Sequence, residues 1–175
     1  MKSVEILTNS PDSVVIASSW VLAEVNSNYE NRYTVLPDGT IRVWARIEIE
    51  EEEVPEMPRF GMKMVMPGDF SSMTWYGSGP HESYWDRKTS AFIGLYSGTV
   101  MEQYTPYITP QENGNKTDVR WVALQNRNGR GLIVIGDKPL GINAHNYLEE
   151  DFDHRVTHTI GVPFRDLVEL SLIHI

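Results

Sequence analysis

Two segments of the sequence, residues 75–88 and 104–121, combine carboxylates and basic side chains with many Gly, Pro and aromatic residues. The first contains Glu82 and Asp86, and the second contains Glu112 and Asp118. Two carboxyl groups can hydrolyse a glycoside, because one protonates the leaving oxygen while the other, about 5 to 9 Å away, attacks or activates water. Each of these carboxylates, however, has an Arg or a Lys nearby in the sequence, and a neighbouring positive charge lowers a carboxyl pKa.

We therefore predict a structural charge network at these segments instead of a catalytic pair. An arginine can donate two parallel hydrogen bonds to a carboxylate and so tie together loops that are rich in Gly and Pro. If Arg120 forms such a buried pair, replacing it with Met leaves an acid unpaired, at a cost of roughly 3 to 5 kcal/mol. The predicted members are Arg87 and Arg120 as donors, with Glu82, Asp86, Glu112 and Asp118 as acceptors.

Histidines offer a second kind of chemistry. His154 and His158 are four residues apart, which could place both on one face and suit a metal ion. No third ligand is evident beside them, so ordinary surface or core histidines are predicted, and the same holds for His81 and His145. We predict no metal site in this chain.

Seven aromatic residues lie in the two segments and could stack on a sugar ring. A β-sandwich needs large side chains between its sheets, so most of the seven are predicted to anchor the core and the loops. Sugar binding by an exposed subset stays open as an alternative. The seven are Trp75, Tyr76, Tyr84, Trp85, Tyr104, Tyr107 and Trp121.

The composition excludes several classes of protein. With 24 acidic and 15 basic residues the net charge is −9, which disfavours binding to nucleic acid. No apolar run approaches the roughly 18 residues of a membrane span, and the N-terminal sequence lacks the apolar stretch of a signal peptide. The absence of cysteine excludes disulfides and thiolate chemistry.

Alternation of apolar and polar residues predicts an all-β chain of many antiparallel strands. Residues 29–36 and 41–49 flank a Pro-Asp-Gly turn and are predicted to form a hairpin. One short helix is predicted at Asn146–Phe152, and the acidic stretch 50–58 is predicted to be a solvated loop. The remaining strands are predicted at 4–6, 14–16, 59–66, 72–76, 92–104, 117–125, 131–136, 141–144 and 156–160.

The two segments also carry long patterns. Residues 75–87 read W-Y-G-x-G-P-x-E-x-Y-x-D-R, and residues 106–121 read P-Y-x-x-P-Q-E-N-G-N-K-T-D-V-R-W. Both patterns, in this order and about twenty residues apart, resemble the C-terminal domain, or small chain, of the large bacterial β-galactosidases of glycoside hydrolase family 2. Weaker similarity covers nearly the whole chain.

The resemblance implies a supersandwich of two large antiparallel sheets, like that of the aldose mutarotases, truncated at its C-terminus. In that family the catalytic glutamates and a magnesium ion lie on a separate TIM barrel. The chain is therefore expected to be a non-catalytic accessory domain of a β-galactosidase acting on terminal β-galactosides such as lactose, without a cofactor of its own.

The expected partners are the barrel and the other domains of the same polypeptide, in the cytoplasm or periplasm of a bacterium. No catalytic or substrate-binding residue is carried over from the family. The alternatives are a free-standing mutarotase-like epimerase, with a His and a carboxylate on the concave face of a sheet, and a carbohydrate-binding module.

The last six residues, Leu170–Ile175, match the translation of a transposon end that is used to fragment DNA for sequencing. We therefore expect the native part of the domain to span residues 1–169 and residues 170–175 to be a non-native tail. Loss of the strands that would follow exposes an edge and apolar faces, so the isolated chain is expected to be marginally stable or prone to aggregation.

Overall fold

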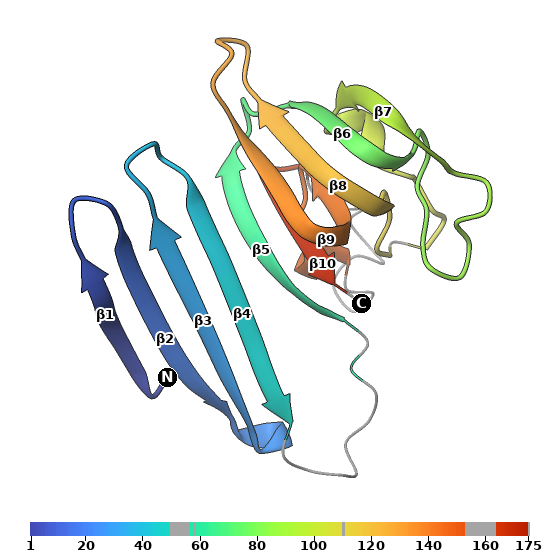
Figure 1. The fold of residues 1–175 in the computed structure, drawn as a ribbon. Helices are drawn as coiled ribbons and strands as arrows, with labels where there is room; N and C mark the ends of the chain where they lie inside the picture. Colours follow the sequence, from blue (N-terminus) through green and yellow to red (C-terminus); the bar gives the residue numbers. More distant parts are fainter. Residues whose placement is uncertain (50–56, 58, 110, 153–163, 175) are drawn as a thin grey trace. The chain divides into compact units, whose positions relative to one another are not determined.

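A computed structural model describes residues 1–49, 57, 59–109, 111–152 and 164–174. The chain divides into two units, Met1–Glu56 and Met57–Ile175, and each is described by itself (Figure 1). Most of the predicted acidic loop at 50–58, the predicted strand at 156–160, and His154 and His158 lie outside the described residues.

The first unit is a four-stranded antiparallel meander. Its strands are β1 (Ser3–Asn9), β2 (Val14–Leu22), β3 (Ser27–Val35) and β4 (Ile41–Ile49), in the order β1-β2-β3-β4, with a short 3₁₀ turn, η1 (Ala23–Val25), between β2 and β3. The predicted hairpin is confirmed, since β3 pairs with β4 from Val35 opposite Ile41 onward. Asp38 Oδ1 accepts a hydrogen bond of 2.8 Å from the Thr40 amide, and Gly39 has a φ of +86° that suits glycine.

The two faces of this meander differ in polarity. Residues directly opposite each other in an antiparallel ladder point to the same face. One face therefore carries Ile41 and Val43 of β4, with Tyr33 and Val35 opposite them on β3. The other face carries charged residues such as Arg42 and Arg46.

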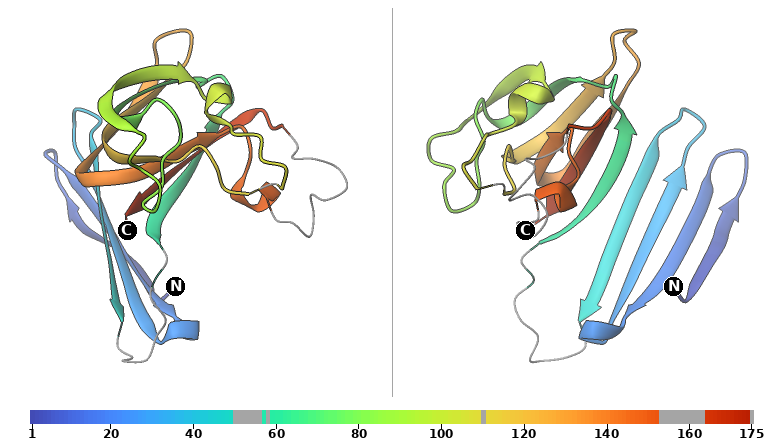
Figure 2. Two further views of the ribbon diagram at one scale, coloured as in Figure 1. Left: turned by 90° about the vertical axis from the view of Figure 1, so that its right-hand side faces the viewer. Right: turned by 180° about the vertical axis from the view of Figure 1, so that it is seen from behind.

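The second unit is a six-stranded antiparallel sheet in the order β5-β10-β9-β8-β6-β7. The side views in Figure 2 show that this sheet is strongly curled. Short 3₁₀ turns follow β7 and β9, namely η2 (Met101–Gln103) and η3 (Glu149–Phe152). The strands are β5 (Phe60–Pro67), β6 (Ser72–Gly79), β7 (Phe92–Thr99), β8 (Lys116–Gln125), β9 (Gly131–His145) and β10 (Leu167–His174).

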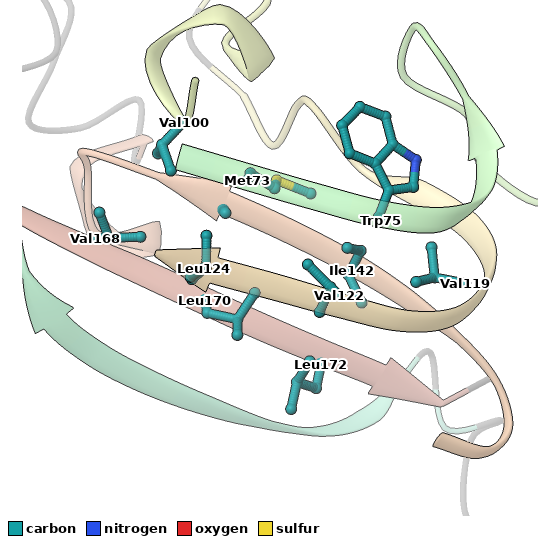
Figure 3. Close-up of a cluster of buried hydrophobic side chains, with 11 residues drawn as sticks. Met73, Trp75, Val100, Val119, Val122, Leu124, Ile142, Val168, Leu170 and Leu172 are labelled. Atoms are coloured by element: carbon teal, nitrogen blue, oxygen red, sulfur yellow. The ribbon is translucent and has the colours of Figure 1, made fainter. Parts of the chain in front are cut away.

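The core of the second unit lies between strands that are distant in the sequence. Trp75 and Met73 of β6 face Val122 and Leu124 of β8, and Leu170 of β10 packs with them (Figure 3). Each of these five side chains is only 1% exposed. The other buried members of the cluster are Val100, Val119, Ile142, Ala144, Val168 and Leu172.

The predicted all-β class with two antiparallel sheets is confirmed, whereas several element bounds differ from the prediction. Strands β1, β2 and β6 are longer than predicted, and β10 is not among the predicted strands. The strand predicted at 92–104 ends at Thr99, where the chain turns into η2. The two strands predicted at 131–136 and 141–144 form one strand, β9, whose pairing with β8 is irregular: Trp121 is opposite Ile135, but Val119 is opposite Leu140. Pro139, which has no amide hydrogen to donate to the ladder, lies within this irregular stretch.

The helix predicted at 146–152 is only the turn η3 (Glu149–Phe152). Asn146 is bonded elsewhere, because its Nδ2 donates to the Leu167 carbonyl at 2.7 Å and its carbonyl accepts from the Arg165 amide at 2.9 Å. Asp151 Oδ2 accepts the Leu148 amide at 2.8 Å, which closes a tight turn. None of the described helices is long and apolar enough to span a membrane.

β10 includes most of the tail that is predicted to be non-native. Leu170–His174 pairs with β5 from Met64 to Phe60, and Leu170–Ile173 also pairs with β9. The origin of these residues stays a prediction.

Candidate functional site

The two motif segments lie side by side: the first begins in β6 and continues into the loop after it, and the second ends in the neighbouring strand β8. The Ser83 amide donates to the Asn115 carbonyl at 2.7 Å, and Asn115 Nδ2 donates to the Ser83 carbonyl at 2.8 Å. The Ser83 hydroxyl accepts the Thr117 amide at 3.0 Å and is also 3.0 Å from the Thr117 hydroxyl. These four bonds join the Gly-Pro loop to the Asn-Gly-Asn turn, so the two patterns form one structural feature.

Glu82 is the centre of the joined loops. Its Oε2 accepts the Gly114 amide at 2.8 Å, and its Oε1 accepts the Tyr107 hydroxyl and lies 3.1 Å from Arg87 Nη2. Burial works to raise the pKa of Glu82, but the hydrogen bonds from Tyr107 and Gly114 outweigh it and hold the pKa below its ordinary value. A carboxyl group in this state is ionised at neutral pH and is a poor general acid.

The structure brings only some of the predicted network together. Arg87 forms an ion pair with Glu82 and also donates a hydrogen bond to the Tyr107 hydroxyl at 3.1 Å. Asp86 is exposed and has no ion pair among the described residues.

The other predicted acids pair outside the predicted set. Glu112 Oε2 is 2.8 Å from Arg59 Nη1, and Asp118 Oδ2 is 3.2 Å from Lys88 Nζ. Arg120 contacts no carboxylate among the described residues. Its Nη1 donates to the main-chain carbonyl of Asp118, and its guanidinium lies 5.6 Å from the centre of the Tyr76 ring.

The burial of two residues at this site could not have been predicted from the sequence. Lys116 is 1% exposed, and its Nζ donates to the Gly114 carbonyl at 3.1 Å and lies 5.4 Å from the Trp75 ring. Burial lowers the pKa of Lys116 to about 8. His145 is 5% exposed, with Nε2 2.7 Å from the Asn113 carbonyl, and burial lowers its pKa.

His145 also lines a small cavity, and its Nδ1 has no hydrogen-bond partner within the described residues. His145 on β9 is directly opposite Glu169 on β10, and burial raises the pKa of Glu169. The cavity encloses only about 10 Å³, which is close to the space that one water molecule needs. Its other lining residues are Arg59, Glu112, Asn143, Glu149, Phe152 and Ser171.

The aromatic residues of the motifs divide into buried and exposed ones. Trp75 is in the core, and Tyr104 packs in an aromatic cluster with His145, Tyr147 and Phe152. Trp85 is 50% exposed, and the Lys88 ammonium lies over its ring at 3.9 Å.

Comparisons with known proteins agree with the two motifs. The family model described as "Beta galactosidase small chain" matches residues 1–174. A β-galactosidase of Priestia megaterium is 42% identical over 146 residues, covering 82% of this chain and 14% of that protein. A β-galactosidase of Halalkalibacterium halodurans is 38% identical over 134 residues, covering 75% and 13%. The corresponding protein of Lactobacillus delbrueckii subsp. bulgaricus is 34% identical over 137 residues, covering 78% and 13%. The chain therefore spans about a seventh of the length of these relatives.

Proposed function

Because the chain belongs to the β-galactosidase small-chain family, we propose that it is a non-catalytic accessory domain of a larger bacterial β-galactosidase. Its role is to support an active site that hydrolyses terminal β-galactosides such as lactose and lies on another domain of the same polypeptide. The relatives that carry the name β-galactosidase are several times longer than the part that this chain matches, which leaves room for such a domain.

The state of Glu82 is the observation that carries this proposal. A glycosidase needs one carboxyl group with a raised pKa as acid and a second carboxylate with access to the sugar. The pKa of Glu82 is lowered, and its oxygens are bonded to Gly114 and Tyr107. Glu112 and Asp118 are each paired with a cation. These three carboxylates of the described motif residues are therefore engaged in holding loops together, which supports an accessory role.

Magnesium and the catalytic carboxylates belong, in this proposal, to the barrel domain of the full-length enzyme. The described residues contain no group of three or more His, Asp or Glu side chains placed to hold a metal ion. The donor set of this part of the chain therefore does not fit a magnesium site.

An aldose epimerase is the second candidate, and the position of His145 beside Glu169 favours it. A His and a carboxylate could transfer the protons that open and close a sugar ring. The cavity at these residues is too small for a hexose, however, since it encloses only about 10 Å³. Measuring the interconversion of the anomers of galactose tests the epimerase directly, and titration calorimetry with lactose tests the carbohydrate-binding module.

The accessory role can be tested with the chain alone and with a chimera. Residues 1–169 would replace the matching segment of the Priestia megaterium enzyme, and hydrolysis of a nitrophenyl β-galactoside would be measured. We expect no hydrolysis by the isolated chain and retained hydrolysis by the chimera. Glu82→Gln in the chimera should lower the melting temperature and leave kcat and KM of the folded fraction unchanged. Hydrolysis by the isolated chain that Glu82→Gln abolishes would contradict the proposal.

A further inference from the structure

The chain contains two Asn-Gly pairs, Asn113–Gly114 and Asn128–Gly129. An Asn followed by Gly is chemically labile, because the unhindered glycine nitrogen can attack the side-chain amide carbon of the Asn. A nitrogen–carbon bond forms, the side-chain carbon–nitrogen bond breaks, and the amide leaves as ammonia together with the proton of the glycine nitrogen. Water then opens the succinimide ring to aspartate or isoaspartate. The only co-reactant is water.

The side chain of Asn113 is fixed at both ends. Its Oδ1 accepts the Thr105 amide at 2.9 Å, and its Nδ2 donates to the Gln111 carbonyl at 3.0 Å. Its main-chain carbonyl is held by His145 Nε2 at 2.7 Å. Asn113 is 1% exposed. The amide carbon that would be attacked therefore cannot rotate toward the glycine nitrogen without breaking bonds in a buried site.

The attacking nitrogen of this pair is also restrained. The Gly114 amide donates to Glu82 Oε2 at 2.8 Å, and Glu82 is itself held by Tyr107 and Arg87. Glycine cannot easily be replaced at this position, because its φ is +72° and an added Cβ would lie 2.5 Å from the Gln103 carbonyl oxygen. The fold thus requires a labile sequence here and surrounds it with bonds that oppose the reaction.

The second pair is exposed, and its Asn side chain has no such protection. Asn128 and Gly129 lie in the exposed turn between β8 and β9, where the Asn128 amide and the Gly129 amide bond to Asn126. Within the described part of the chain, no hydrogen bond holds the Asn128 side chain, and a Cβ added at Gly129 would meet nothing within 4 Å. The side chain that would be attacked is therefore free to rotate and is in contact with water, and the Gly129 amide is held only by one main-chain hydrogen bond in an exposed turn.

We propose that Asn128–Gly129 is a site of spontaneous deamidation in the folded protein, and that the Glu82 hydrogen bond shields Asn113–Gly114 from the same reaction. The two pairs form a matched comparison inside one molecule. In the unfolded chain they should react at similar rates, so a difference in the native state reports what the fold does.

Peptide mapping by mass spectrometry tests the proposal on the full chain. The protein is incubated in mildly alkaline buffer, native and in urea, and each peptide is followed by the mass change of an NH₂ replaced by an OH. We expect native Asn113 to convert at least about tenfold more slowly than native Asn128, and the two to converge in urea. Equal native rates would overturn the shielding. Faster conversion of Asn113 in the native protein than in urea would also overturn it, since Glu82 would then act as a base for the attack.

Two variants separate the role of Glu82 from that of overall stability. Glu82→Ala removes the acceptor of the Gly114 amide, and Val122→Ala weakens the core without touching the turn. The temperature of incubation is set so that both variants have the same unfolded fraction. We expect Asn113 to convert several-fold faster in Glu82→Ala than in Val122→Ala. Equal rates in the two variants would show that global opening controls the reaction and that Glu82 has no specific role.

Discussion

Lys116 lies in the core beside Trp75, where its ammonium has one hydrogen bond to the Gly114 carbonyl and the Trp75 ring nearby. Burying a charge with so few partners is costly, and the cost is reflected in a pKa of about 8 instead of 10.5. The folded chain therefore loses the Lys116 proton at a lower pH than the unfolded chain does. Below about pH 8 Lys116 is charged in both states, and burying its charge lowers the free energy of unfolding. This penalty decreases as the pH rises above 8 and is gone once Lys116 is also deprotonated in the unfolded chain.

The first prediction concerns this pH dependence. Between pH 8 and 10 the unfolded chain binds more protons at Lys116 than the folded chain, so the free energy of unfolding should rise by about 2 kcal/mol. Above about pH 10 the trend should reverse, since burial raises the pKa of Tyr84 and the unfolded tyrosine ionises first. Urea titrations across this range should show the rise in the parent protein and in Lys138→Met, which removes an exposed lysine. Lys116→Met should lack it, and parallel profiles for all three proteins would show that Lys116 does not carry the effect.

The second prediction compares two arginines. Arg165 donates to both oxygens of the buried Asp151, at 2.7 and 2.6 Å, and this hydrogen bonding lowers the pKa of Asp151. Arg120 bonds only to a main-chain carbonyl. Arg165→Met should therefore cost about 2 kcal/mol at neutral pH, because it leaves a carboxylate unpaired, and Arg120→Met should cost about 1 kcal/mol.

Acid should remove the effect of the first substitution. As the pH falls through the lowered pKa of Asp151 the carboxylate is protonated in the parent, so its stabilisation by Arg165 is lost and the two proteins converge. Thermal unfolding at neutral and acidic pH measures this. A larger loss in Arg120→Met than in Arg165→Met would mean that Arg120 has a carboxylate partner after all.

Residues close together in the sequence could be paired by inspection, and the remote ones could not. Glu82 and Arg87 are five positions apart in one loop, so their contact could be anticipated from charge alone. Arg165 and Asp151 meet because Asn146 bonds both to the Arg165 amide and to the Leu167 carbonyl. The types and spacing of these residues do not predict the hydrogen bonds that bring Arg165 to Asp151. The burial of Lys116 and His145 likewise depends on contacts between residues that are distant in the sequence.

At the scale of the elements, turn chemistry predicted the β3–β4 hairpin, since Pro, Asp and Gly each have a local preference that the turn uses. No local sequence preference of this kind predicts the strand order β5-β10-β9. β5 and β10 are separated by about 100 residues of chain, and their pairing buries Leu170 and Leu172 in the common core. Alternation identifies each strand, but it does not say which strand is the neighbour.

The third prediction uses glycines with similar backbone conformations. Gly39 and Gly114 have φ values of +86° and +72°, so an alanine at either position is strained. A Cβ at Gly39 meets nothing within 4 Å, whereas one at Gly114 would lie 2.7 Å from His145 Cε1 and 2.5 Å from the Gln103 carbonyl oxygen. Gly39→Ala should cost about 1 kcal/mol, and Gly114→Ala about 3 kcal/mol or more, because the buried turn must shift.

Gly129→Ala is the control for this comparison. It has a φ of +73° and open space around it, so it should resemble Gly39→Ala. Chemical denaturation of the three variants gives the ranking. A cost at Gly114 no greater than at the other two would mean that the turn is free to adjust and that its hydrogen bonds do not hold it rigidly.

At the scale of the whole molecule, the apolar face of the four-stranded meander decides how the chain behaves alone. Eight of the apolar residues that the register places on this face are each at least 37% exposed, and such a concentration of exposed apolar side chains is typical of an interaction surface or an aggregation site. They are Val4, Ile6, Trp20, Leu22, Val35, Ile41, Val43 and Ile49.

The fourth prediction is that the isolated chain associates through this face at neutral pH. Val43 and Val21 are a matched pair for the test, since they are 44% and 42% exposed, on opposite faces of the same meander. Val43→Lys should lower the apparent mass in light scattering and reduce the binding of a hydrophobic dye, because a charge on the apolar face must be desolvated on association. Val21→Lys should leave both measurements close to those of the parent. A parent chain that remains a monomer with one cooperative thermal transition, or equal effects of the two substitutions, would show that this face does not drive association.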